Sequence, residues 1–342
     1  MAAGMALFVI GCMLAGPQAL TVSHPKTGRL LKTLATDLGR VESVVFSPNG
    51  RQVLASAAQV VKIWNFETGA LLLSLRPDPD TTFNSAAFSP NGTRVVTAST
   101  GGTFTVWNAA QGKKLLQKGG LSQFAKAEFS PDGKQVVTAG DDATVAIWDA
   151  KTGVKQKELK GHYGHVKTAK FSPDGSYVVT AGRDGYVRVY NATTGKLRAS
   201  KREDVNCNEV TFSAEFSPDG RQVVTASTSG YATVWDVGGD GPQERRKLEA
   251  GHEEVGPWKL VAYVNSAAFS PKVRSRPGCC VFRGGERVLT ASMTARMFDT
   301  ETGELLKTFE GHAREVSSAV FSPDGSKIVT ASYDGTVKVW RA

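Results

Sequence analysis

FSPDG, at residues 171–175, is the stretch that decides the fold of this chain, because it recurs. Five further copies read FSPDG or FSPNG, and one truncated copy reads FSP before Lys272. The seven copies begin at Phe46, Phe88, Phe129, Phe171, Phe216, Phe269 and Phe321. Successive copies are 42, 41, 42, 45, 53 and 52 residues apart. A period of about 40–45 residues, with four short strands in each unit, is typical of a propeller blade.

Each repeat unit carries the turn and strand signals of a four-stranded sheet. A run such as VSSAVF (316–321) precedes the turn, in which Pro presets φ and Gly takes the positive φ that closes it. A second strand rich in β-branched residues follows, as in KIVTAS (327–332), and then a third strand that ends in an aromatic residue. These aromatic residues are Trp64, Trp107, Trp148, Tyr190, Trp235, Phe298 and Trp340. A fourth strand such as GELLKTF (303–309) completes the unit, so we predict an all-β chain of antiparallel blades.

The first and last units predict how the blades close into a ring. The last unit reaches Ala342 just after its third strand, whereas residues 27–34 resemble a fourth strand with no first three strands of its own. Pairing 28–34 with the last unit gives seven complete blades and leaves only short, protected sheet edges. We therefore predict a seven-bladed β-propeller over residues 27–342, closed by strand 28–34.

Residues 1–26 are predicted to be a separate, apolar segment. No charged side chain occurs in residues 1–23, but Gly16-Pro17 leaves an apolar run shorter than the roughly 20 residues of a membrane-spanning helix. Three interpretations stay open: a degenerate repeat or disordered segment, an export or lipoprotein signal, and an anchor. We expect a cytoplasmic protein, or an exported one if residues 1–16 act as a signal.

Composition limits the classes of function. The net charge of +9 comes from 41 basic and 32 acidic residues spread along the chain, which favours a solvated basic surface over one that tracks phosphates. The four cysteines form no CxxC pair, which favours a reducing compartment over a disulfide framework or zinc site. They are Cys12, Cys207, Cys279 and Cys280. We expect no metal or cofactor, and neither nucleic acid nor a membrane as partner.

Short motifs give the chain a resemblance to a known family. Trp-Asp ends the third strand at 148–149 and 235–236, and Gly-His recurs before first strands, as at 311–312. With FSPDG, these motifs make residues 27–342 similar to the WD-repeat β-propeller family. The resemblance implies a buried, hydrogen-bonded tetrad, which the last unit matches with His312, Ser332, Asp334 and Trp340.

Other units depart from the tetrad. Unit four has Gly182 where the hydroxyl is expected, and units one, two and five lack both the His and the Asp. We expect these three units to depend more on apolar packing.

The resemblance also implies that one face of the ring, made by the loops that lead into first strands and the turns after second strands, binds peptides. Lining up the units assigns to this face Arg40, Glu42, His165, Lys167, Arg183, Phe212, Trp258, Tyr263, Asn265, Met293, Glu315 and Tyr333. His165, Lys167 and Arg183 make a basic corner, while Phe212 and Tyr263 supply apolar anchors. A scattered, solvated rim explains the same residues equally well.

Unit six has two insertions. EEVGPWKLVAYV (253–264) lengthens the loop before its first strand and places Trp258 on the peptide-binding face. KVRSRPGCCVFRGGER (272–287) is a basic insertion on the opposite face, which is a specialised contact, a mobile loop or an error in gene prediction.

The leading hypothesis is a noncatalytic platform that binds peptides or proteins, as a monomeric propeller within a larger complex. One alternative is a propeller enzyme of the lactonase or quinone-dependent type, with a small-molecule substrate. The innermost positions read mostly Ala, Val, Ser and Thr, which argues against it. The other alternative is binding of an anionic polymer or membrane through 272–287.

Overall fold

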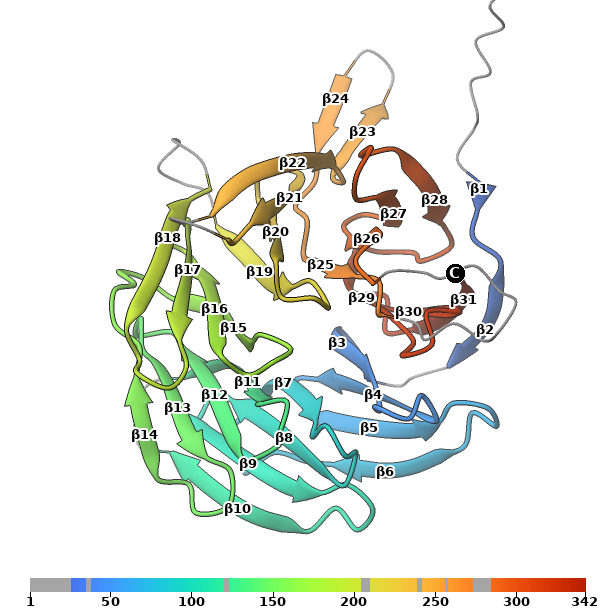
Figure 1. The fold of residues 1–342 in the computed structure, drawn as a ribbon. Coiled ribbons are helices and arrows are strands. Elements are labelled where there is room, and N and C mark those ends of the chain that lie inside the picture. Colours follow the sequence, from blue (N-terminus) through green and yellow to red (C-terminus); the bar gives the residue numbers. More distant parts are fainter. Residues whose placement is uncertain are drawn as a thin grey trace, which may run out of the picture.

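The computed structural model describes residues 26–34, 38–119, 123–203, 210–238, 242–255, 258–272 and 284–342, with the backbone alone at 26 and 252–260. Seven of the described sheets are blades around a central axis, and the chain passes from blade to blade in order (Figure 1). The first strand of each blade contacts the first strands of both neighbouring blades, and β29 contacts β3, which completes the ring. The predicted seven-bladed, all-β propeller is confirmed.

Each blade is a four-stranded antiparallel sheet, and blade six carries one further strand at its outer edge. Blade one comprises β3 (Val41–Phe46), β4 (Gln52–Ala57), β5 (Val60–Asn65) and β6 (Leu71–Leu75), and blade two comprises β7 (Phe83–Phe88), β8 (Arg94–Ser99), β9 (Thr103–Asn108) and β10 (Lys114–Gly119). Blade three comprises β11 (Phe124–Phe129), β12 (Gln135–Gly140), β13 (Val145–Asp149) and β14 (Lys155–Glu158), and blade four comprises β15 (Val166–Phe171), β16 (Tyr177–Gly182), β17 (Tyr186–Asn191) and β18 (Leu197–Arg202). Blades five to seven comprise β19 (Thr211–Phe216), β20 (Gln222–Ser227), β21 (Tyr231–Asp236) and β22 (Gln243–Glu249); β25 (Ser266–Phe269), β26 (Arg287–Ala291), β27 (Ala295–Asp299), β28 (Leu305–Phe309) and β1 (Lys26–Thr27); and β29 (Val316–Phe321), β30 (Lys327–Ser332), β31 (Val337–Arg341) and β2 (Leu30–Leu34).

The two ends of the described chain share a sheet, as the sequence predicts. Strand β2 pairs antiparallel with β31, with Leu30 opposite Trp340 and Leu34 opposite Val337 (Figure 1). Leu34 is buried in a core cluster that joins blades seven and one. In addition, β1 pairs in parallel with β28 and so extends blade six, which the sequence analysis did not predict.

The recurring FSPDG turn is held by its own side chains. In blade seven the Ser322 hydroxyl donates to Asp324 Oδ1 at 2.5 Å and accepts the Lys327 N–H at 2.9 Å. Gly325 has φ 66°, a conformation that residues with a Cβ rarely adopt. The turn therefore sets the register of the first two strands from local sequence alone.

Apolar side chains fill the spaces between blades. In one core cluster Leu289 and Phe309 of blade six pack against Ile328 and Trp340 of blade seven. The ring centroids of Phe309 and Trp340 are 5.8 Å apart. Burying a side chain of this size contributes about 1.5–3 kcal/mol, so the interfaces between blades supply much of the stability.

Unit six differs from the others in the two places that the sequence indicates. The lengthened loop contains a two-stranded hairpin, β23 (His252–Val255) paired with β24 (Trp258–Val261), which the sequence analysis did not predict (Figure 1). Most of the basic insertion, including Arg274, Arg276 and Arg283, lies outside the described residues, as do residues 1–25 and the four cysteines.

Candidate functional site

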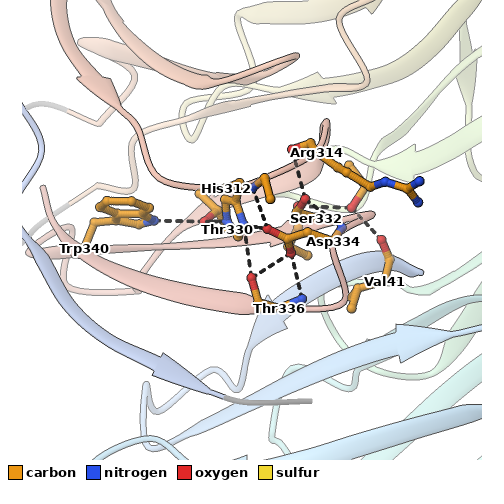
Figure 2. Close-up of polar contacts among 11 residues, drawn as sticks. Val41, His312, Arg314, Thr330, Ser332, Asp334, Thr336 and Trp340 are labelled. Atoms are coloured by element: carbon orange, nitrogen blue, oxygen red, sulfur yellow. Dashed lines mark hydrogen bonds and ion pairs between the residues drawn. The ribbon is translucent and has the colours of Figure 1, made fainter. Parts of the chain in front are cut away.

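The histidine network of blade seven lies within the sheet (Figure 2). His312 precedes β29, Thr330 lies on β30, and Asp334 lies in the turn before β31. With the proton of His312 on Nδ1, it donates to the Asp334 carboxylate at 2.9 Å, and Thr330 Oγ1 donates to Nε2 at 2.7 Å. The same Thr330 oxygen accepts the indole N–H of Trp340 at 2.8 Å. The tetrad therefore satisfies both buried N–H groups.

The hydroxyl in this network belongs to Thr330, and the prediction of Ser332 in that role is wrong. Trp340 lies opposite Ile328, so Thr330 is its diagonal neighbour across the strand pair. Ser332 is two residues further along the strand, or about 7 Å beyond Thr330, which is out of reach of the indole. Its hydroxyl instead donates to the Arg314 carbonyl and accepts the Asp334 N–H, each at 3.0 Å.

The same shift by two residues corrects the prediction for blade four. His162 Nε2 lies 2.7 Å from Thr180 Oγ1, so Gly182 does not deprive this blade of its hydroxyl. Asp184 binds His162 Nδ1 at 2.9 Å and also pairs with the buried Arg188 at 2.7 Å.

Blades two, three and five use parts of this arrangement. Three further tryptophans, Trp107, Trp148 and Trp235, donate to Thr97, Thr138 and Thr225. In blade five the buried Glu203 carboxylate accepts the hydroxyls of Thr211 and Thr225, so this blade has a polar network that the sequence analysis missed.

The two buried histidines make stability depend on pH. Burial lowers the pKa of His162 and of His312, although Asp184 and Asp334 act to raise them. The unfolded chain therefore binds more protons than the folded chain as pH falls through the ordinary histidine pKa near 6.5. We expect the melting temperature to fall between pH 7.5 and pH 5, as measured by circular dichroism.

A variant with both His162→Gln and His312→Gln provides the control. Glutamine keeps hydrogen-bonding groups but does not titrate, so the slope of melting temperature against pH should be smaller than in the intact chain. Equal slopes in the two proteins would contradict the role of these histidines.

We call the face where the seven first strands begin the rim face. A cavity of about 340 Å³ opens there at the mouth of the axial channel. Five of the predicted rim residues line it: Glu42, Lys167, Phe212, Asn265 and Tyr333. The structure thus brings together residues from blades one, four, five, six and seven.

A first group lies where blades seven and one meet. The Arg40 guanidinium stacks 3.5 Å from the ring centre of Tyr333, and its Nε lies 3.0 Å from Glu42 Oε1. Burial raises the pKa of Glu42, although Arg40 opposes the shift. Glu315 also lies here, since its carbonyl accepts the Tyr333 N–H at 3.1 Å.

The predicted basic corner contains a carboxylate. His165 Nδ1 lies 3.2 Å from Asp141 Oδ1, and Lys167 Nζ lies 3.6 Å from the same atom. Arg183 is exposed beside them, and its backbone N–H donates to the His165 carbonyl at 2.8 Å. The corner is therefore less positive than its lysine and arginine alone suggest.

The predicted aromatic anchors form a pair across blades five and six. The rings of Phe212 and Tyr263 are 6.1 Å apart, and Tyr263 is 59% exposed. Met293, in the β26–β27 turn, is also exposed. Trp258 lies on β24, but its side chain is outside the described residues.

Asn265 has a structural role that the sequence did not reveal. Its amide donates to the Val316 carbonyl of the next blade at 3.0 Å. Asn84 makes the equivalent bond to Phe124 at 2.8 Å, and the Ser317 hydroxyl donates to the Val41 carbonyl at 2.7 Å. The residue four positions before the FSP phenylalanine therefore links neighbouring blades in these three places.

Charged residues lie inside the channel, where the sequence analysis expected small and apolar ones. A second cavity, of about 90 Å³, is lined by Lys126, Glu128, Lys170 and Glu215 from three consecutive blades. Lys170 pairs with Glu215. Burial opposes it, but Glu215 and Glu128 raise the pKa of Lys170 above its usual value. The signal was present in the aligned first strands, whose fifth residues are Glu128, Lys170 and Glu215 in blades three to five.

Removing one member of the channel ion pair should destabilise the ring. Glu215→Gln leaves the Lys170 ammonium without its contacting carboxylate. We expect a loss of about 1–3 kcal/mol, because both side chains of the pair are partly exposed and solvent screens the charge that remains. Urea unfolding measures the loss. The variant with both Lys170→Met and Glu215→Leu should recover much of it, and a double variant less stable than Glu215→Gln would contradict this account.

The fold and the buried networks define a repeat propeller, and comparison with known proteins places it in a family. The WD domain, G-beta repeat family model matches residues 28–65, 70–108, 118–149, 153–191, 199–236 and 303–341, so the chain belongs to the WD40 family. The unmatched stretch 237–302 contains both insertions of unit six. In the part of the chain that the structure describes, no helix could span a membrane.

Several curated proteins are similar to part of the chain. A pre-mRNA-processing factor 19 homolog 2 of Arabidopsis thaliana is 35% identical over 20% of this chain and 14% of its own length. A periodic tryptophan protein 2 homolog of Schizosaccharomyces pombe is 37% identical over 26% of this chain and 10% of its own. A serine-threonine kinase receptor-associated protein of Gallus gallus is 30% identical over 26% of this chain and 23% of its own length. The matches thus cover less than a quarter of each relative.

Proposed function

We propose that this protein is a noncatalytic scaffold that binds a protein or peptide on the rim face and holds it in an assembly. The observation that carries the proposal is the cavity of about 340 Å³ at the channel mouth, with the Phe212–Tyr263 pair on one side and the Arg40–Tyr333 stack on another. Exposed aromatic and arginine side chains around a depression are the composition of binding hot spots.

The state of the histidine networks supports a noncatalytic role. The side chain of His312 is 2% exposed, and its two ring nitrogens are occupied by Asp334 and Thr330. The hydroxyl of Thr330 is itself engaged by an indole N–H. A nucleophile and base that act on a substrate must be reachable by it, which this arrangement prevents.

Membership of the WD40 family supports the same proposal, because one relative is by its name associated with a receptor. This support is by analogy of fold, so the test must locate the surface on this chain.

Affinity capture with three purified forms of the chain tests the proposal. The rim variant carries Lys167→Glu, Arg183→Glu and Tyr263→Ala. The control variant carries Lys134→Glu, Arg221→Glu and Leu72→Ala, which change exposed residues on the opposite face and the outer edge. We expect a protein that binds the intact chain and the control variant but not the rim variant, and that rebinds when purified. Identical recovery with all three forms would exclude the rim face as the docking surface.

A further inference from the structure

The residue three positions before the FSP phenylalanine of each blade belongs to a ring at the channel mouth, and one member differs in chemistry from the others. The seven residues are Ser43, Ser85, Lys126, Thr168, Ser213, Ser266 and Ser318. Six of them line the cavity, all but Thr168.

The serines of the ring have a structural role. Ser85 Oγ accepts the N–H of Ala127 in the next blade at 3.1 Å. Ser213 and Ser266 make the equivalent bonds to Ala267 and Ala319 at 3.2 and 3.3 Å. An ammonium group cannot accept a hydrogen bond, so Lys126 does not replace a serine in this linkage.

The charges around the cavity leave Lys126 without a partner. Each acid that lines the cavity already has a basic neighbour: Glu42 has Arg40 at 3.0 Å, and Asp141 has His165 and Lys167 within 3.6 Å. Among the described residues, by contrast, none forms a hydrogen bond or ion pair with Lys126. The cavity therefore carries one positive charge that no contacting group matches.

The carboxylates deeper in the channel, Glu128 and Glu215, attract Lys126 but do not contact it. Burial, together with Lys170, lowers the pKa of Lys126 to about 8, although Glu128 and Glu215 act to raise it. Glu215 is itself in contact with Lys170. An anion that enters from the rim face would meet a cation that its own protein solvates poorly.

We propose that the channel mouth binds a carboxylate, with Lys126 as its ion-pair partner. The proposal rests on the proposed function, since the carboxylate is a group of the docked peptide: the side chain of Asp or Glu, or a free C-terminus. The cavity of about 340 Å³ is at the small end of ligand sites, which suits one side chain or chain end. Ser85 and Gln123 line the same cavity and are neutral groups that can donate to the second carboxylate oxygen.

Three short peptides with matched sequences test the proposal by NMR titration of the whole chain labelled with ¹³C-lysine. The first is Gly-Ser-Glu-Ser-Gly with both ends blocked, and the second is its blocked Gln counterpart. The third is the Gln peptide with a free C-terminal carboxylate. We expect at least one carboxylate peptide to shift the Lys126 Cε resonance and to bind about 10-fold or more tightly than the neutral peptide. The peptide that binds identifies the source of the carboxylate.

The matched variants are Lys126→Ser, which restores the residue of five other blades, and Lys134→Ser on the opposite face. Lys126→Ser should bind all three peptides as weakly as the neutral one, whereas Lys134→Ser should behave as the intact chain. Equal binding of all three peptides by the intact chain would overturn the proposal without any variant. So would unchanged carboxylate binding by folded Lys126→Ser, or the absence of a shift at Lys126.

Failure of this inference is distinguishable from failure of the proposed function. A partner lost from the rim variant in affinity capture, together with no carboxylate binding, would leave docking on the rim face intact and remove only the role of Lys126. Carboxylate binding at Lys126 together with identical recovery in all captures would keep the role of Lys126 and remove docking of a protein on the rim face.

Discussion

Deletion of residues 28–34 should lower the melting temperature of the protein by roughly 10 °C or more and open the ring. The deletion removes β2, and with it the ladder to β31 and the burial of Leu34. Net contributions of about 0.5–1.5 kcal/mol for each hydrogen bond and 1.5–3 kcal/mol for the leucine add to several kcal/mol. At about 2–4 °C per kcal/mol, the shift is easily measured by circular dichroism.

Opening the ring has a second consequence. The deletion exposes the edge of β31, and an unpaired strand edge is a template for association with another chain. We expect the shortened protein to form dimers or larger species on size-exclusion chromatography. A shortened chain that melts within a degree or two of the intact protein and stays monomeric would show that the closure contributes little.

Point variants on β2 separate the packing of the strand from its presence. Leu34 is 5% exposed and Leu30 is 43% exposed, on the same short strand. Leu34→Ala should therefore cost about 2–4 kcal/mol, whereas Leu30→Ala should cost roughly 1 kcal/mol or less. Equal losses would mean that Leu34 does not join the two blades as the structure has it.

Replacement of Thr330 by valine should lower the free energy of unfolding by roughly 2–4 kcal/mol. This is the second of the two large effects that we expect. Valine keeps the shape of threonine but removes the one oxygen that serves both His312 Nε2 and the indole N–H of Trp340. Two buried polar groups then lose their partner, at about 1–3 kcal/mol each. Urea unfolding at pH 7.5, where the histidine is neutral in both states, measures the loss.

Ser332→Ala is the control that tests which hydroxyl holds the network. It removes the bonds to the Arg314 carbonyl and the Asp334 N–H but leaves the His312–Thr330–Trp340 chain intact. We expect a loss of about 1 kcal/mol. If Ser332→Ala were as damaging as Thr330→Val, the sequence-based assignment would be right and the geometric one wrong.

The blades differ in the polar networks that hold their strands together, so some blades should open before others. Blades four and seven each have a histidine bound to a threonine hydroxyl, and blade five has Glu203 in its place. Blade one has Ala55 at the position where Thr330 lies in blade seven, so its core there is apolar. Local opening measured by hydrogen exchange should therefore begin in blades other than four, five and seven.

The sequence by itself determined the number of blades, the strand order and the closure of the ring. Each FSPDG turn is held by bonds among residues within five positions of one another, such as Ser322, Asp324 and Lys327. In six of the seven units the aromatic residue that ends the third strand follows the FSP phenylalanine by 18 or 19 residues. Because these signals are local and repeated, the architecture follows from counting them.

Only the tertiary structure decided which side chains meet. Whether Thr330 or Ser332 contacts Trp340 depends on the register between β30 and β31. A shift of two residues keeps every side chain on the same face of the sheet, so the alternating sequence pattern does not distinguish the two hydroxyls. Lys126, Lys170 and Glu215 come from separate repeats and share the channel only because the ring closes. Lys126, Lys170 and Glu215 are more than 40 positions apart from one another, so the repeat pattern aligns them but does not show that they lie close together.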